Sequence, residues 1–204
     1  MASPALLLAQ CLGLDVYDPP SAELAVQTLL RIRQIFPARQ SCVSGGMAMV
    51  HYVGKQNYKI APTLELLVSV SSPKLIGRHF HTQDKAFQIA IPCGAITIKC
   101  TATTDVMEKD IIAQSKIANM AGSLVRVVSP EGLMALKFVA GQPEDLRDLR
   151  LLLCRRQNNS DDEAVLGRAR DIIARHYPNR LTELTTMLSG YDEAGGAAIP
   201  RPSG

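Results

Sequence analysis

The chain has 204 residues, of which 47% are hydrophobic and 20% charged, and its formal net charge is +3. This length and apolar content suit one globular domain, or one core with a small helical appendage. The near balance of 22 basic and 19 acidic residues, together with the absence of Trp and an aromatic content of 4%, argues against long nucleic acid as a ligand.

The N-terminal segment, residues 1–20, contains the short apolar run ALLLAQCLGL with no Lys or Arg before it. A signal peptide has a positive region ahead of its apolar run, and this run is too short to span a membrane. We therefore expect residues 1–20 to form a short helix or extension that packs on the core. The five cysteines form no CxxC pair, which favours reduced thiols, so the sequence predicts a soluble, cytoplasmic protein.

Residues 21–128 are expected to form an α/β core. Ser21 is the expected N-cap of its first helix, and Pro37 ends that helix. Cys93 and Gly94 form the expected bend of a hairpin, in which a disulfide from Cys93 to Cys100 is a minor alternative. The expected elements are a helix from 21 to 36, a strand over 41–44, a turn and a helix to about 53, and strands over 63–70, 86–94 and 95–102.

The second half of the chain is expected to be mostly helical. Residues 105–122 are predicted to form one helix, and 124–129 a brief strand that leads to Ser129 as the cap of the next helix. The helical C-terminal region, 129–190, is expected to contain four helices, and the small, polar residues 191–204 a flexible tail. This order predicts an α/β (or α+β) fold with a small mixed sheet and helices on one side of it.

Three motifs carry a resemblance to a known family. They are VSGGMAMVHYVG at 43–54, KIAPTLELLVSV at 59–70 and VVSPEGLMALKFVAGQPEDLRDLRLLL at 127–153. In order and spacing they resemble the nucleotidyltransferase fold, in the branch of small bacterial proteins that includes minimal nucleotidyltransferases and abortive-infection toxins. The resemblance covers about residues 20–156 and implies a nucleoside triphosphate and Mg²⁺ as ligands.

The chemistry of nucleotidyl transfer explains what such a site requires. A divalent metal bridges the triphosphate oxygens, and two carboxylates at positions i and i+2 of a strand hold it from one face. Ser44, Gly45 and Gly46 form the turn through which backbone N–H groups are expected to reach phosphate, at the N-terminus of a helix. Lys137 is expected to add a positive charge.

The catalytic motif of this chain is degenerate. Where the family has two aspartates, the alignment places Thr63 and Glu65, and Lys59 stands where Arg is usual. The third acidic position, on a neighbouring strand, falls at Lys99, Cys100 or Thr101. One carboxylate in place of three removes most of the metal affinity on which the reaction depends.

The sequence therefore favours a non-catalytic module with one of three roles: binding a nucleotide, acting in regulation, or binding a protein partner, as in a toxin–antitoxin pair. The alternative is an active metal-dependent nucleotidyltransferase that modifies RNA, protein or a small molecule, in which Glu65 would share a metal with Asp105 or Asp145. The candidate residues are Thr63 and Glu65 for catalysis, Glu65 for metal, Ser44, Gly45, Gly46, Lys59 and Lys137 for the nucleotide, and Asp145 and Asp148 as accessory groups. Charge pairing along a helix, with Arg147 and Arg150 interleaved, explains the last two slightly better than a chemical role does.

Overall fold

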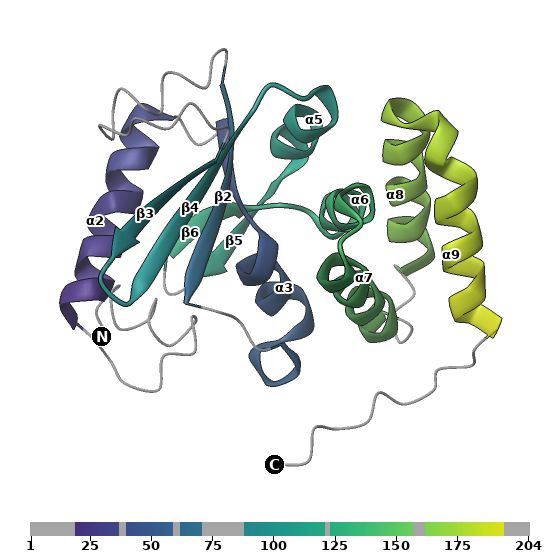
Figure 1. The fold of residues 1–204 in the computed structure, drawn as a ribbon, viewed down its shortest axis with the longest axis horizontal. Helices are drawn as coiled ribbons and strands as arrows, with labels where there is room; N and C mark the ends of the chain where they lie inside the picture. Colours follow the sequence, from purple (N-terminus) through teal and green to yellow (C-terminus); the bar gives the residue numbers. More distant parts are fainter. Residues whose placement is uncertain are drawn as a thin grey trace.

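The fold of this computed structural model is a six-stranded mixed sheet with helices packed against it (Figure 1). The structure describes residues 19–36, 40–58, 62–70, 88–120, 123–156 and 162–193. In chain order the elements are α2 (Pro19–Ile35), β1 (Ser41–Ser44), α3 (Gly45–Val53), η2 (Lys55–Asn57), β2 (Thr63–Ser69), β3 (Gln88–Cys93), β4 (Ile96–Thr103), α5 (Val106–Gln114), β5 (Lys116–Met120), β6 (Ser123–Val127), α6 (Pro130–Ala140), α7 (Pro143–Arg156), α8 (Asp162–His176), η3 (Pro178–Arg180) and α9 (Leu181–Glu193).

The strand order is β3-β4-β2-β1-β6-β5, with parallel pairs β2/β4 and β1/β6 and antiparallel pairs elsewhere. The predicted mixed α/β fold is thus confirmed. Strand β4 alternates cleanly, because Ile96, Ile98 and Cys100 are buried while Thr97 and Lys99 between them are half-buried. Such alternation is typical of a strand with one face on the core and the other partly open to water.

Helices cover both faces of the sheet, so the expectation of helices on one side was wrong. Helix α2 packs on β3 and β4, whereas α3 and α5 pack on β2 from the other side (Figure 1). The register explains the division, since Cys100 and Leu66 are partners on the α2 face and Lys99 and Glu65 on the opposite face. Leu67, two residues after Glu65 on that opposite face, is 4% exposed, so both faces carry buried apolar side chains.

Ser21 is not the N-cap of the first helix, because α2 already begins at Pro19. Its hydroxyl instead accepts a hydrogen bond of 2.9 Å from the backbone N–H of Ala95, in the turn between β3 and β4. Cys93 and Cys100 are buried free thiols in this hairpin, with Ile96 opposite the first and Ile89 opposite the second. The alternative of a disulfide between them is therefore wrong.

The predicted single helix over 105–122 was wrong as well. Helix α5 ends at Gln114, and the chain turns at Ser115 into β5, which pairs with β6. The side chain of Arg126 on β6 donates to the carbonyls of Ala113 and Ser115, at 3.2 and 2.6 Å. These bonds satisfy carbonyls at the end of the helix and so stabilise its termination there.

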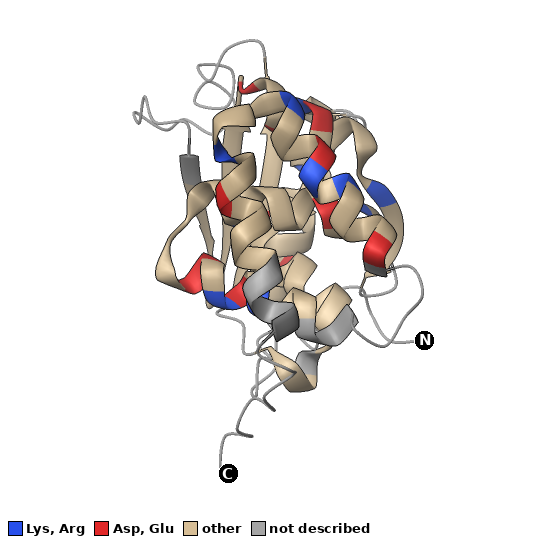
Figure 2. Cartoon of the chain, turned by 90° about the vertical axis from the view of Figure 1, so that its right-hand side faces the viewer, with Lys and Arg blue, Asp and Glu red and all other residues tan. Residues whose placement is uncertain are grey.

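The described residues after Val127 are helical from α6 to α9, and these helices lie on the α3 side of the sheet (Figure 1). Ser129 caps α6 as expected, accepting a hydrogen bond from the Gly132 N–H at 3.3 Å. Acidic and basic residues alternate along the outer helices (Figure 2). Among the described residues no helix has the length and apolar character that crossing a membrane requires.

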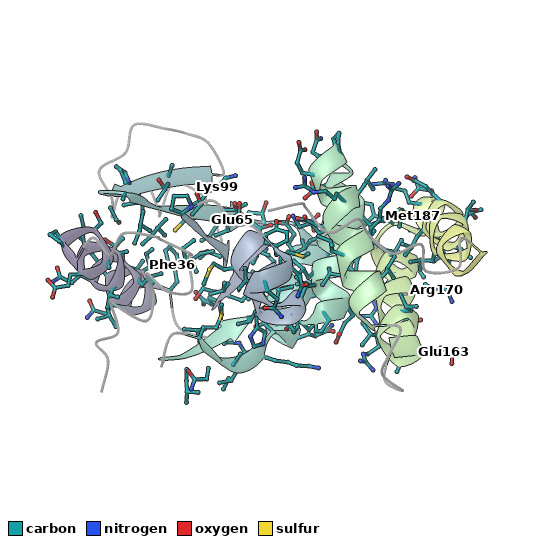
Figure 3. All side chains as sticks on the ribbon, turned by 90° about the horizontal axis from the view of Figure 1, so that it is seen from below. Phe36, Glu65, Lys99, Glu163, Arg170 and Met187 are labelled. Carbon is teal, nitrogen blue, oxygen red and sulfur yellow. The ribbon has the colours of Figure 1, made fainter. Side chains whose placement is uncertain are left out.

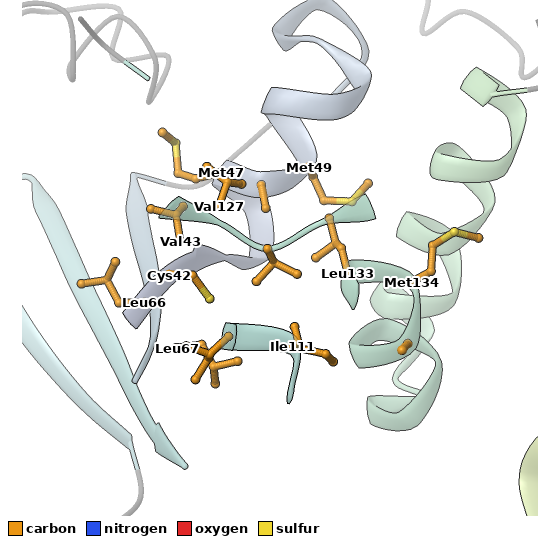
Figure 4. Close-up of a cluster of buried hydrophobic side chains, with 14 of the residues drawn as sticks. Cys42, Val43, Met47, Met49, Leu66, Leu67, Ile111, Val127, Leu133 and Met134 are labelled. Atoms are coloured by element: carbon orange, nitrogen blue, oxygen red, sulfur yellow. The ribbon is translucent and has the colours of Figure 1, made fainter. Parts of the chain in front are cut away.

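Part of the apolar core joins the sheet to α3, α5 and α6. Figure 4 shows Cys42 and Leu67 from neighbouring strands facing Ile111 of α5, with Met49 and Leu133 close by. All five side chains are at most 4% exposed. Because aliphatic and sulfur-containing side chains fill this region, α3 is fixed firmly against β1 and β2, which positions the turn described next.

Candidate functional site

The turn from β1 into α3 is formed by Ser44, Gly45 and Gly46, as predicted from the sequence. Gly45 has a φ of +57°, a left-handed conformation that glycine adopts most readily. Ser44 is at the N-cap position, but its side chain makes no capping hydrogen bond. The first N–H groups of the helix are therefore left to another acceptor or to water.

Glu65 extends from β2 over this turn. Its backbone is paired with Ser44 across the antiparallel β1/β2 ladder. A Cβ added to Gly45 would overlap the Glu65 carboxylate and would lie 3.1 Å from the Glu65 Cβ. A negative charge thus lies at the N-terminal end of α3, where the helix dipole favours an anion.

Lys99 of β4 faces Glu65 across the parallel β2/β4 ladder. The two residues are register partners, and Lys99 Nζ lies 3.7 Å from Glu65 Oε1 (Figure 3). The side chains are 38% and 32% exposed, respectively. Thr63 lies on the same face two residues earlier, opposite Thr97. The face beside the α3 N-terminus therefore carries one carboxylate, one ammonium group and neighbouring threonine hydroxyls.

This group of side chains does not fit a magnesium ion. Mg²⁺ requires several hard oxygen ligands in octahedral order, and here one carboxylate is matched with an ammonium group that repels cations. No cluster of three or more His, Cys, Asp or Glu residues suited to a metal occurs in the part of the chain that the structure describes. Asp105 follows the far end of β4, six residues beyond Lys99, which at the rise of a β-strand is roughly 20 Å away.

The second group of predicted site residues lies between α6 and α7. Lys137 Nζ is 2.7 Å from Asp145 Oδ1 and 2.9 Å from Asp148 Oδ2, and the Tyr58 hydroxyl donates to the same Asp148 oxygen at 2.9 Å. Asp148 is 2% exposed and its Oδ1 has no partner among the described residues. Lys137 and Asp145 are partly buried, at 14% and 17% exposed, and the group has one basic and two acidic side chains.

Electrostatics within this group keep Lys137 protonated. Burial alone would lower the pKa of its ammonium group, but the hydrogen bonds and charges of Asp145 and Asp148 outweigh burial and raise the pKa. The pKa of Tyr58 is raised to about 12, first by burial and then by the charge and hydrogen bond of Asp148. Lys137 is thus already bound to two carboxylates, whereas a phosphate-binding lysine needs its charge for the ligand.

The sequence-predicted residues therefore fall into two places. Ser44, Gly45, Gly46, Thr63 and Glu65 lie together at the start of α3, and Lys137, Asp145 and Asp148 lie together between α6 and α7. Helix α3 contacts both β2 and α7, and no ion pair between described residues joins the two groups. Lys59 lies outside the described residues, so its predicted role stays a prediction.

Two residues of these groups were not named as site residues from the sequence. Lys99 was one of three positions at which the third acidic residue of the family was expected. Only the strand register shows that Lys99 is the partner of Glu65. No local sequence pattern indicated a role for Tyr58, because its hydrogen-bond partner Asp148 is 90 residues away in the sequence. The β2/β4 alternation could have identified Lys99 if the pairing of the strands had been known.

No protein-family model matches the chain, and no curated protein does either. Among solved structures, the chain is similar to an antigenic nucleotidyltransferase-like protein from Paracoccidioides brasiliensis. That similarity covers 86% of this chain and 88% of the other, with a TM-score of 0.45 and 12% sequence identity.

Proposed function

We propose that this chain is a non-catalytic module with a nucleotidyltransferase-like fold, which binds a nucleotide as a regulatory ligand. The sequence motifs support the fold assignment, since the Gly45-Gly46 turn follows a strand and opens a helix, as the resemblance implies. The location of that turn supports the ligand, because backbone N–H groups at a helix N-terminus favour phosphate oxygens. We also propose that the protein is a pseudoenzyme and that it acts in the cytoplasm.

The observation that carries the non-catalytic part of the proposal is the Glu65–Lys99 ion pair, at 3.7 Å. An active site of this kind needs negative charges that gather a metal, and here a resident ammonium group neutralises the carboxylate that remains. The alternative transferase would need a second carboxylate beside Glu65. Asp145 is bound to Lys137, and Asp105 caps α5 by accepting the Glu108 N–H at 3.0 Å.

The experiment is a direct test of transfer and of binding with the full chain. We would incubate it with each of ATP, GTP, CTP and UTP carrying a labelled α-phosphate, with Mg²⁺ or Mn²⁺, and would follow self-labelling and labelling of total RNA. Parallel calorimetric titrations with and without metal would measure binding. We expect binding of at least one nucleotide without any requirement for metal, and no metal-dependent transfer.

Two results would overturn this proposal. Metal-dependent labelling that disappears in Glu65→Gln would establish an active transferase. The absence of binding to all four nucleotides would remove the nucleotide ligand, and a protein partner, as in toxin–antitoxin pairs, would become the hypothesis to test.

A further inference from the structure

We propose that Glu65 and Lys99 are internal occupants of the nucleotide site: the carboxylate takes the place of a phosphate group at α3, and the ammonium group takes the place of the metal. A nucleotide then binds only by displacing Glu65, without metal. This inference rests on the proposed function above, since it concerns how the same site is controlled.

The first step of the argument is the position of the Glu65 carboxylate. It lies against Gly45 so closely that the glycine has no room for a Cβ. Gly45 begins a nine-residue helix whose N-cap Ser44 makes no side-chain capping bond. The Glu65 carboxylate is therefore the anion beside the N-terminus of α3, where Ser44 makes no side-chain capping bond. A phosphate group that approached this N-terminus would be opposed by both the volume and the negative charge of Glu65.

The second step is the charge balance of the pair. Lys99 is the register partner of Glu65, and its ammonium group lies 3.7 Å from the carboxylate. A divalent cation on this face would be repelled by the ammonium group and would find one carboxylate instead of several. Because the pair is neutral as a whole, it offers a metal ion no net negative charge.

The third step is that the pair is weak enough to open. Glu65 is 32% and Lys99 38% exposed, and ion pairs with this degree of exposure contribute little to stability. The Lys137–Asp148 pair differs, since its carboxylate is 2% exposed and would lose its partner inside the protein if the pair opened. Displacement at the Glu65–Lys99 pair is therefore accessible to a ligand, and once Glu65 has moved, Lys99 is free to contact a phosphate oxygen.

The test uses the full chain and four variants, with ATP and inorganic tripolyphosphate as probes in the presence of EDTA. Glu65→Gln keeps the shape and removes the charge, Lys99→Met removes the cation, and Glu65→Ala is a second variant in case the first folds poorly. Glu163→Gln is the matched control, because this exposed glutamate lies on α8, away from Glu65 (Figure 3). Circular dichroism checks the fold of each variant.

We expect Glu65→Gln to bind both probes roughly tenfold more tightly than the original chain, because a like charge near the phosphates has gone. Lys99→Met should bind more weakly than the original chain, and Glu163→Gln should be unchanged. Equal affinity of Glu65→Gln and the original chain would overturn the inference while leaving nucleotide binding in place. Binding by none of the proteins would overturn the proposed function as well.

A second measurement tests the role of Lys99 as the resident cation independently of nucleotides. Lys99→Asp places a second carboxylate in register with Glu65 on the neighbouring strand. We expect this variant to bind Mn²⁺ at least tenfold more tightly than the original chain, measured by electron paramagnetic resonance, since paired carboxylates are suited to a hard cation. Mn²⁺ affinity that is equal in the two proteins would contradict the view that Lys99 replaces the metal.

Discussion

Lys137 Nζ lies 2.9 Å from Asp148 Oδ2, and this carboxylate is 2% exposed. The pair connects α6 to α7, and the Tyr58 hydroxyl joins it from the segment that follows η2. Taking two charges out of water is costly, and their attraction offsets that cost only while both are present. The group therefore joins α6 and α7 to the segment that follows η2, and we expect its loss to lower the stability of the fold.

Replacing Lys137 with Met should strongly destabilise the fold. The variant leaves Asp148 buried with only the Tyr58 hydroxyl, and breaking a buried ion pair in this way costs about 3–5 kcal/mol. Urea unfolding at neutral pH measures the loss. The matched control is Lys116→Met, an exposed lysine on β5, which should change the free energy of unfolding by less than about 0.5 kcal/mol. Comparable effects of the two substitutions would contradict a structural role for the Lys137 group.

Replacing Tyr58 with Phe should cost about 1.5–3 kcal/mol at neutral pH, because a hydrogen bond to a buried carboxylate is lost. The pKa of Tyr58 is raised from 10.0 to about 12, so the folded state holds the phenolic proton more tightly than the unfolded state does. The stability from this difference is complete below about pH 10 and is lost as the pH rises through about 12.

The difference in unfolding free energy between the original chain and Tyr58→Phe should therefore shrink from about pH 10 upward. Lys137 is present in both proteins, so its own titration largely cancels in the comparison. Urea unfolding of both proteins at several pH values in this range gives the difference directly. A difference that stays constant up to about pH 12 would show that Tyr58 does not titrate as its surroundings imply.

Substituting Gly45 with Ala should destabilise the fold more than the same change at Gly141. Both glycines have positive φ, +57° and +64°, but the new Cβ at Gly141 would meet nothing closer than 3.7 Å. Gly141→Ala therefore measures the backbone cost alone, about 1–2 kcal/mol, and Gly45→Ala adds the overlap with Glu65.

A double-mutant cycle separates the two contributions at Gly45. In Gly45→Ala/Glu65→Ala the overlapping carboxylate is gone, so the second substitution should recover the part of the loss that exceeds the cost at Gly141. Thermal or urea unfolding of the three variants gives the coupling. Strict additivity of the two single changes would mean that Glu65 moves aside at no cost.

The sequence was sufficient for the features that depend on local chemistry. The Gly45-Gly46 turn, the Ser129 cap and the start of α7 at Pro143 follow from glycine, serine and proline chemistry within a few residues, and the structure has all three. The mixed sheet also followed from the order of the predicted helices and strands.

The errors arose where a distant partner decides the outcome. The segment 105–122 was predicted to be one helix, but α5 ends at Gln114, where Arg126, more than ten residues later, binds the carbonyls of Ala113 and Ser115 and the chain enters β5. Ser21 bonds to Ala95, 74 residues away, instead of capping its own helix. The Glu65–Lys99 pair depends on the register of two strands separated in the sequence, which no local pattern specifies.

The thiol of Cys42 should resist alkylation in the folded protein. Burial raises its pKa to about 12 against the opposing charge of Arg126, and the residue is 2% exposed between β1 and α5. Only the thiolate reacts, so at about pH 9 the folded protein should label at Cys42 far more slowly than the urea-unfolded protein, by at least about a hundredfold. Mass spectrometry of peptides after iodoacetamide treatment measures this site by site. Burial also raises the pKa of Cys100 to about 12, so this thiol should behave in the same way. Rapid labelling of Cys42 in the native protein would contradict the packing of α5 on the sheet.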